Sequence, residues 1–275
     1  MDFLDNKILI TGDLHGDFKK IRYICKECQT SKKDTLIILG DCGFNYFLNK
    51  RDEELKEKIS EYPITIFAVR GNHELRPEKM KNEWHYEYYF FGLVIVEDKY
   101  PNIKYAIDGR SYCFPWILKE EELFFYRFFV IGGAYSPDKD IRIKNNWSWF
   151  EDEQLNKEER EEIIKNLNWL YDNKAKGPVD IFLSHTCPLK YEPKELFFPE
   201  TDQSKVDKSM EKFLDEIESK YDYKFWFFGH FHGDKKINSF DKNKEQFLLF
   251  NEVLDLKEFL KTKNYNKSIL CKYCG

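Results

Sequence analysis

The chain has 275 residues, with 44 basic and 49 acidic side chains, so its formal net charge is −5. Charged residues make up 34% and aromatic residues 17% of the chain, which excludes an intrinsically disordered protein and a coiled coil. The acidic balance also argues against a protein that coats nucleic acid, because phosphate contacts need clustered lysine and arginine. Histidine is scarce, with six copies, so the positions of these residues carry much of the functional information.

The N-terminal segment gives no sign of export. Asp2 and Asp5 lie where a secretory signal would need basic residues followed by an apolar run. The most apolar segment, residues 123–135, contains Arg127 and is shorter than the roughly 18 to 20 residues that a membrane-spanning helix needs. We therefore expect a soluble, cytoplasmic protein with no membrane partner.

Short apolar runs alternate with helix-forming stretches along the chain, which predicts an α/β fold. Runs suited to strands buried on both faces cover residues 7–11, 35–39, 64–69, 128–131, 179–183 and 224–228. Helical spacing is found in residues 18–27, 52–61, 158–171 and 205–220. Further strand candidates with no intervening helix, which suggests antiparallel pairing, cover residues 93–96, 103–107, 235–240 and 246–250. We expect one catalytic domain over residues 1–260 and a C-terminal tail over residues 261–275.

Five of the predicted strands end in side chains that can bind a metal ion. These segments are Gly12-Asp13-Leu14-His15, Gly40-Asp41, Gly71-Asn72-His73-Glu74, Ser184-His185 and Gly229-His230-Phe231-His232. Because ligands bind outside the carboxyl ends of parallel strands, we expect these side chains to converge. A glycine precedes the ligand in four of the segments, which lets the chain turn sharply there.

Each segment alone has an ordinary explanation, because Asp, Asn and His after a strand are common turn, cap or core residues. The joint pattern is much more specific. Asp13 and Asp41 are 28 residues apart, and Asp41 and Asn72 are 31 apart, each about one strand-helix-strand unit. All the histidines except His85 fall within the five segments.

This set of carboxylate, amide and imidazole side chains suits divalent transition-metal ions. The ligands are too many for one ion, so we expect two ions that share a carboxylate, with Mn²⁺ as the leading candidate and Fe, Zn, Ni or Co as alternatives. Two ions about 3.5 to 4 Å apart can clamp the attacking and leaving oxygens of a phosphoryl centre. The pattern therefore predicts hydrolysis of a phosphate ester by a metal-bound hydroxide.

In order and spacing, the five segments resemble the motifs of the calcineurin-like metallophosphoesterases, over residues 13–232. The resemblance implies a four-layer αββα sandwich with mixed sheets and a dinuclear centre. It implies that His73 lies over the substrate, where it would stabilise the phosphoryl group or protonate the leaving oxygen. The ligand sets implied for the two ions are Asp13, His15, Asp41 and His232 for one, and Asp41, Asn72, His185 and His230 for the other, with Asp41 as the bridge.

The chain departs from the protein Ser/Thr phosphatase branch of this family after Asp41. Phe44 stands where that branch has the carboxylate that orients its catalytic histidine, and no arginine follows. This difference argues against a phosphoprotein substrate and leaves His73 without an evident orienting partner. Arg142, in a long loop over residues 134–152, is our candidate for binding the substrate phosphate. Arg70 precedes a turn, and we expect it to brace that turn.

The seven cysteines include two pairs with CxxC spacing. Cys25 and Cys28 lie on the first predicted helix, and Cys271 and Cys274 lie at the end of the chain. One hypothesis is a structural zinc site in which the four thiolates tie the tail to the helix. The alternative is that the helix cysteines are small core residues and the tail is frayed.

Together these features predict a metal-dependent phosphoesterase that acts on a phosphomonoester or phosphodiester, either a phosphorylated small molecule or a nucleotide. One alternative is a nuclease or nucleotide phosphodiesterase of the same family, although the acidic charge makes long nucleic acid an unsuitable substrate. Another is a non-catalytic scaffold with this fold. The sequence leaves the oligomeric state open.

Overall fold

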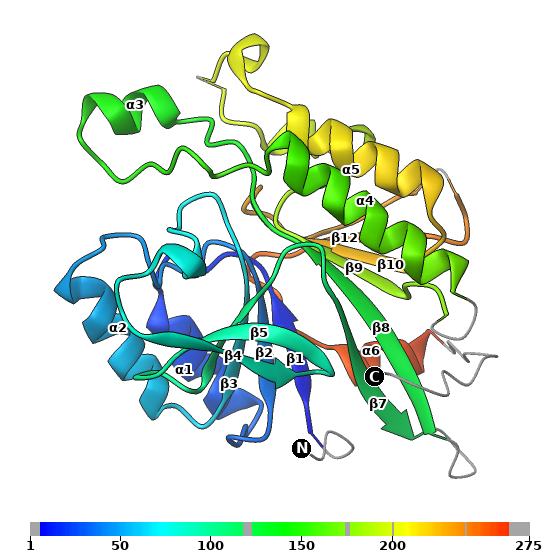
Figure 1. Cartoon of the computed structure of the whole chain (residues 1–275), viewed down its shortest axis with the longest axis horizontal. Coiled ribbons are helices and arrows are strands. Elements are labelled where there is room, and N and C mark those ends of the chain that lie inside the picture. Colours follow the sequence, from blue (N-terminus) through cyan, green and yellow to red (C-terminus); the bar gives the residue numbers. More distant parts are fainter. Residues whose placement is uncertain (1–5, 118–122, 174–176, 200, 240, 264–275) are drawn as a thin grey trace.

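The computed structural model describes residues 6–117, 123–173, 177–199, 201–239 and 241–263, which form two mixed sheets packed face to face (Figure 1). The first sheet has the strand order β13 (Leu254–Asp255), β1 (Ile8–Thr11), β2 (Thr35–Leu39), β3 (Thr65–Val69), β6 (Ile103–Ala106), β5 (Gly92–Glu97) and β4 (Trp84–Tyr89). The second has the order β11 (Lys235–Ile237), β12 (Glu245–Leu248), β10 (Phe225–Phe228), β9 (Ile181–Ser184), β8 (Leu123–Ile131) and β7 (Ser111–Ile117).

Helices cover the outer face of each sheet. On the first sheet these are α1 (Phe18–Glu27) and α2 (Lys50–Glu61), and on the second they are α4 (Lys157–Asp172) and α5 (Ser209–Lys220). The order of layers is therefore helix, sheet, sheet, helix, which confirms the predicted αββα sandwich. Smaller elements are α3 (Lys139–Lys144), α6 (Leu256–Thr262) and the single turns η1 (Pro77–Lys79), η2 (Leu189–Tyr191), η3 (Lys194–Leu196) and η4 (Gln203–Lys205).

The inner strands have apolar side chains on both faces, as the sequence predicts. Along β2, Ile37 and Leu39 pack into the core between the two sheets, whereas Leu36 and Ile38 pack against α1 and α2. This alternation is the two-residue period of a strand that is buried on both sides. It fixes the register of the strand and so determines where its carboxyl end lies.

Parallel pairing brings the strand ends that are followed by candidate ligands to one edge of each sheet. Strands β1, β2 and β3 are parallel neighbours, and so are β8, β9, β10 and β12. The segments predicted to pair antiparallel do so, β5 with β6 and β11 with β12. The predicted helix over residues 205–220 is shorter in the structure, because α5 begins at Ser209, whose N–H bonds the carboxylate of Asp207.

Two loops extend beyond the layers. One carries α3, and the other, between β9 and α5, carries η2 to η4 (Figure 1). None of the helices in the part of the chain that the structure describes is both long and apolar enough to cross a bilayer. Residues 264–275, most of the predicted tail, lie outside the described residues, so the division into a domain and a tail stays a prediction.

Candidate metal centre

All seven candidate ligands lie where the carboxyl ends of the two sets of parallel strands meet. Asp13, Asp41 and Asn72 follow β1, β2 and β3 of the first sheet. His185 follows β9 of the second sheet, and His230 and His232 follow β10. The convergence that we expected from the sequence is therefore present. The ligands form two groups, which we call the outer half and the inner half of the centre.

The outer half contains Asp13, His15 and His232, which are placed closely enough to hold one metal ion. The Nε2 atoms of the two histidines are 2.8 Å apart, and His232 Nε2 lies 3.3 Å from Asp13 Oδ2. Burial opposes ionisation of Asp13, but the neighbouring His185 and His232 outweigh it and lower the pKa of this carboxyl. The contact with the Asp13 carboxylate raises the pKa of His232.

The inner half is built around Asp41, Asn72 and His185. His185 Nε2 is 2.7 Å from Asn72 Oδ1 and 3.7 Å from Asp41 Oδ2. His185 Nδ1 donates to the carbonyl of Leu39 at 2.7 Å, which leaves the unprotonated Nε2 available to bind a metal ion, a common arrangement for metal-binding histidines. The ring of His230 packs against that of His185 at 5.0 Å between centroids. Burial, reinforced by His185, lowers the pKa of His230 to about 3, so its ring is neutral.

The glycines before the ligands permit this close packing. A Cβ atom on Gly40 would lie 2.1 Å from Nδ1 of His185, and a Cβ on Gly71 would lie 2.0 Å from Oδ1 of Asp41. Any larger residue at either position would push apart ligands that come from different strands. The Gly-Asp and Gly-Asn-His motifs therefore have a packing reason as well as a turn-forming one.

Four of the candidate ligands have left-handed backbone conformations. The φ angles are +48° for His15, +47° for Asp41, +69° for His230 and +51° for His232. Residues other than glycine adopt this region at a cost, and such conformations cluster at functional sites. The backbone is strained here at the positions that direct side chains into the centre.

The chemistry of these residues fits divalent metal ions. Oδ2 of Asp13 is buried and accepts no hydrogen bond from the described residues. Such an oxygen is costly to bury unless a cation or donor reaches it. The imidazole nitrogens of His15 and His232 face each other beside it. A second group that could hold an ion consists of Asp13, Asp41 and His185, so Asp13 belongs to both groups, whereas the family resemblance implies Asp41 as the bridge.

A family model described as calcineurin-like phosphoesterase matches residues 6–234, most of the chain. The chain belongs to this family. The match includes every one of the motifs at the strand ends, so the resemblance inferred from the sequence is confirmed. The Asp and His cluster fits the hydrolysis of phosphate esters, the chemistry in the family's description.

Comparison with solved structures shows the same fold. One solved structure matches with a TM-score of 0.51 at 16% identity, over 92% of this chain and 96% of the other. TT1561 of Thermus thermophilus matches at 0.49 and 13% identity, over 92% of this chain and 95% of that one. Phosphopantetheinyl hydrolase (PptH) from Mycobacterium tuberculosis matches at 0.49 and 12% identity, over 90% and 91%. No curated protein matches the chain in a sequence comparison.

His73, for which the sequence offers no orienting partner, is contacted by an arginine. Arg142 Nη2 lies 3.1 Å from His73 Nε2, while its Nε donates to Asp138 and its Nη1 to the hydroxyl of Tyr46. Burial lowers the pKa of His73, and Arg142 lowers it further, against the opposing effect of Asp41. Phe44, at the position where the phosphatase branch has its carboxylate, is buried in the core. The chain thus brings Arg142, which is 69 residues away in the sequence, into contact with His73.

Two carboxylates that are not among the predicted site residues support the centre. Glu153 accepts hydrogen bonds from Ser136, and the Ser136 hydroxyl accepts one from the amide of Asn72 at 2.8 Å, so Asn72 Oδ1 is directed at His185. Glu74 accepts from the backbone N–H groups of Cys42 and Gly43, immediately after Asp41. Glu74 directly follows the Asn-His motif in the sequence, and this position could have indicated that it supports the centre. Nothing in the sequence spacing relates Ser136 to Glu153.

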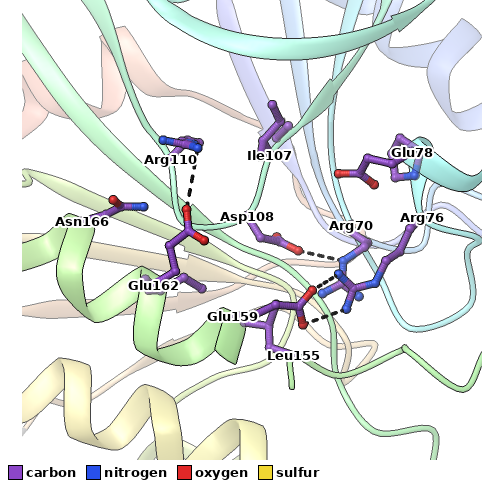
Figure 2. Close-up of a pocket in the computed structure, with 13 residues that line it drawn as sticks. Arg70, Arg76, Glu78, Ile107, Asp108, Arg110, Leu155, Glu159, Glu162 and Asn166 are labelled. Carbon is purple, nitrogen blue, oxygen red and sulfur yellow. Dashed lines mark hydrogen bonds and ion pairs between the residues drawn. The ribbon is translucent and has the colours of Figure 1, made fainter. Parts of the chain in front are cut away.

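Arg70 braces the turn before Asn72, as we expected. Its guanidinium donates to Asp108 at 2.8 Å and to the backbone carbonyls of Gly132 and Glu153. It lines a cavity of about 170 Å³ behind the centre, where Arg76 and Arg110 also pair with acidic side chains (Figure 2). This region is a network of ion pairs that ties the first sheet to α4.

Two larger cavities open on the centre, and His15, Asp41, His73 and Arg142 line both. One, of about 560 Å³, extends between the α3 loop and the loop before α5. The other, of about 590 Å³, extends along α2. Both volumes are in the range of small-molecule sites.

Of the two CxxC pairs, only the first lies in the part of the chain that the structure describes. Cys25 is buried on α1, Cys28 is half-buried directly after the helix ends, and both are free thiols. Burial raises the pKa of each. Cys271 and Cys274 lie outside the described residues, so the four-cysteine zinc site stays a prediction.

Proposed function

We propose that this protein hydrolyses a phosphate ester with the aid of two divalent metal ions held at the converging strand ends. The observation that supports this most is the pair of buried carboxylates, Asp13 and Asp41, enclosed by the imidazole rings of His15, His185 and His232 from both sheets. Two divalent ions carry about four positive charges against about two negative ones from the carboxylates, so the loaded site would attract phosphate in an acidic chain.

The proposed ligand sets are those implied by the family motifs, Asp13, His15, Asp41 and His232 for one ion, and Asp41, Asn72, His185 and His230 for the other. When bound, the two ions would activate a water molecule and polarise the phosphoryl oxygens. Mn²⁺ is the ion we propose, with Fe, Zn, Ni and Co as alternatives that the experiment below compares.

His73 and Arg142 are the residues that we propose act on the substrate. A guanidinium can only donate, so His73 Nε2 accepts the hydrogen bond from Arg142 and the ring proton lies on Nδ1. This arrangement favours a role for the pair in binding and stabilising the phosphoryl oxygens over proton donation from Nε2. Asp138 and Tyr46 hold the guanidinium in place, so little further side-chain entropy is lost when phosphate binds.

The proposed substrate is a small phosphorylated molecule or a nucleotide, because the two cavities beside the centre match small ligands in volume. A cytoplasmic location stays a prediction.

A metal-supplemented activity screen tests the proposal. Phosphomonoesters and cyclic and linear phosphodiesters are incubated with the protein and each of the five metals, and Asp41→Ala provides the blank. We expect turnover that requires added metal and falls at least about 10³-fold in Asp41→Ala, because this carboxylate contacts both halves of the centre. His85→Ala, at an exposed histidine of β4 that pairs with Asp98, is the matched control and should retain full activity. No turnover with any of these metals would overturn the proposal and favour the non-catalytic scaffold.

A further inference from the structure

The cavity along α2 has a cationic wall that the hydrolysis of a simple monoester does not require. Arg51, Glu54, Leu55 and Lys58 line it and lie at positions i, i+3, i+4 and i+7 of the helix. Residues at this spacing share one face, so α2 presents a continuous strip to the cavity over about 10 Å. The strip begins beside the segment that connects Asp41 to α2.

The two cations of this strip have no acidic partner. Glu54 pairs with Lys50 at 3.3 Å, and neither Arg51 nor Lys58 forms an ion pair with any residue in the described ranges. The guanidinium of Arg51 lies over the ring of Phe47, 3.6 Å from its centroid. An arginine in this arrangement keeps its N–H groups available at the edge of the stack.

The arginines of the cavity behind the centre show the contrast. Arg70, Arg76 and Arg110 each pair with a carboxylate, at 2.8 Å, 2.5 Å and 3.8 Å (Figure 2). Those charges are neutralised within the protein, whereas the charges of the α2 strip remain available for a ligand.

A chain of contacts connects this strip to the catalytic histidine. The Phe47 ring meets that of Tyr46 edge-on at 4.7 Å, and the Tyr46 hydroxyl accepts from Arg142, which contacts His73. The backbone of this segment is fixed, since the N–H groups of Phe47 and its neighbour donate to the carboxylate of Asp52. Two guanidinium groups and the two aromatic rings between them therefore form a firmly held wall that leads away from the metal centre.

We propose that the substrate carries a second anionic group, a phosphate or a carboxylate, that binds Arg51 and Lys58 while its scissile phosphate lies at the metal centre. This inference rests on the proposed function and adds a substrate class to it. The other large cavity suits such a group less well, because its cations Lys205 and Lys208 already pair with acidic side chains.

Matched synthetic esters test the inference. Hexyl phosphate supplies one anionic group, 1,6-hexanediol bisphosphate supplies a distal phosphate on the same chain, and 6-(phosphonooxy)hexanoate supplies a distal carboxylate. With the wild-type protein and the best metal, we expect kcat/KM for at least one two-anion ester to exceed that for hexyl phosphate about tenfold, the effect of a charge-assisted contact. The ester that gains identifies which anion the strip binds.

The double variant Arg51→Gln, Lys58→Gln should lower kcat/KM for the preferred two-anion ester about tenfold more than for hexyl phosphate. Arg22→Gln, Lys26→Gln, which removes the same charges from exposed positions of α1, should leave both values unchanged. Equal rates for all three esters, or an equal loss for all three in the double variant, would overturn this inference while leaving the proposed function intact. Failure of the wild-type protein to hydrolyse any of the three esters, with turnover in the metal-supplemented screen above, would overturn this inference alone, whereas no turnover in either assay would overturn both.

Discussion

The two halves of the candidate metal centre differ in how firmly the protein holds their ligands. In the outer half, the side chains of His15 and His232 are each 38% exposed, and their nearest polar neighbours are each other and Asp13. In the inner half, His185 is fully buried and Asn72 is 1% exposed. The difference follows from position, since His15 and His232 line the cavity between the α3 loop and the loop before α5, whereas Asn72 and His185 line neither of the two cavities.

Supporting hydrogen bonds follow the same division. His185 is fixed by the carbonyl of Leu39, and Asn72 by Ser136 and through it by Glu153. Ligands that are oriented before binding lose little freedom when an ion arrives. We therefore expect the inner half to bind its ion more tightly, and the outer half to exchange its ion more readily.

The largest expected effect comes from removing one histidine from each half. His185→Ala should abolish tight binding of the inner ion and lower kcat about 10³-fold, because it deletes a buried ligand and the partner of Asn72. His232→Ala should leave close to one tightly bound ion per chain and lower metal affinity in the outer half alone. Metal content after dialysis, by mass spectrometry, together with calorimetric titration, measures both.

His85→Ala is the control for this pair, since His85 is an exposed histidine that pairs with Asp98 outside the centre. Loss of both ions in His232→Ala, or retention of a tight ion in His185→Ala, would show that the two halves do not differ as the burial of their ligands implies.

An intermediate effect should follow from the residues behind Asn72. Ser136→Ala removes the hydroxyl that accepts from the Asn72 amide, and Glu153→Gln alters the group that holds this hydroxyl. Loss of such supporting contacts costs about 10- to 100-fold in metal affinity or activity. We expect this loss for the inner ion, with the outer ion unaffected, in the same titrations. Ser219→Ala on the exposed face of α5 serves as control, and unchanged affinity in both variants would count against the orienting role.

Much of this site can be predicted from the sequence because its ligands follow strands at regular spacing. The strands themselves are predictable where apolar residues occupy both faces, as in β2. Strand β4 escapes prediction because its exposed His85 and half-buried Glu87 interrupt the apolar pattern at the edge of the sheet. Strand β7 also escapes prediction, because it contains Pro115 and proline argues against a strand. The proline is tolerated there because β7 lies at the edge of the second sheet.

The contacts that cross long stretches of sequence are less predictable. The position of Arg142 in a long loop suggests phosphate binding, but its contact with His73, 69 residues away, depends on how that loop folds back. The hydrogen bonds from Asn72 through Ser136 to Glu153 join side chains with no periodic relation. Such partners are set by tertiary packing, which a local pattern does not encode.

The smallest expected effect concerns stability, and it compares the two halves without mutation. Titration of the metal-loaded protein with a chelator should remove the outer ion first and abolish activity with little change in Tm. Removal of the inner ion should then lower Tm by several degrees, because a ligand at about 100 times its Kd stabilises the native state by about 2.7 kcal/mol, and each kcal/mol corresponds to about 2 to 4 °C at this chain length. This stabilisation grows with the ratio of ion concentration to Kd, so the more tightly held inner ion should contribute most of it. Scanning calorimetry with parallel activity assays tests this order. A single step, in which activity and Tm fall together, would mean that both ions contribute equally to stability and that the exposure of His15 and His232 has no thermodynamic consequence.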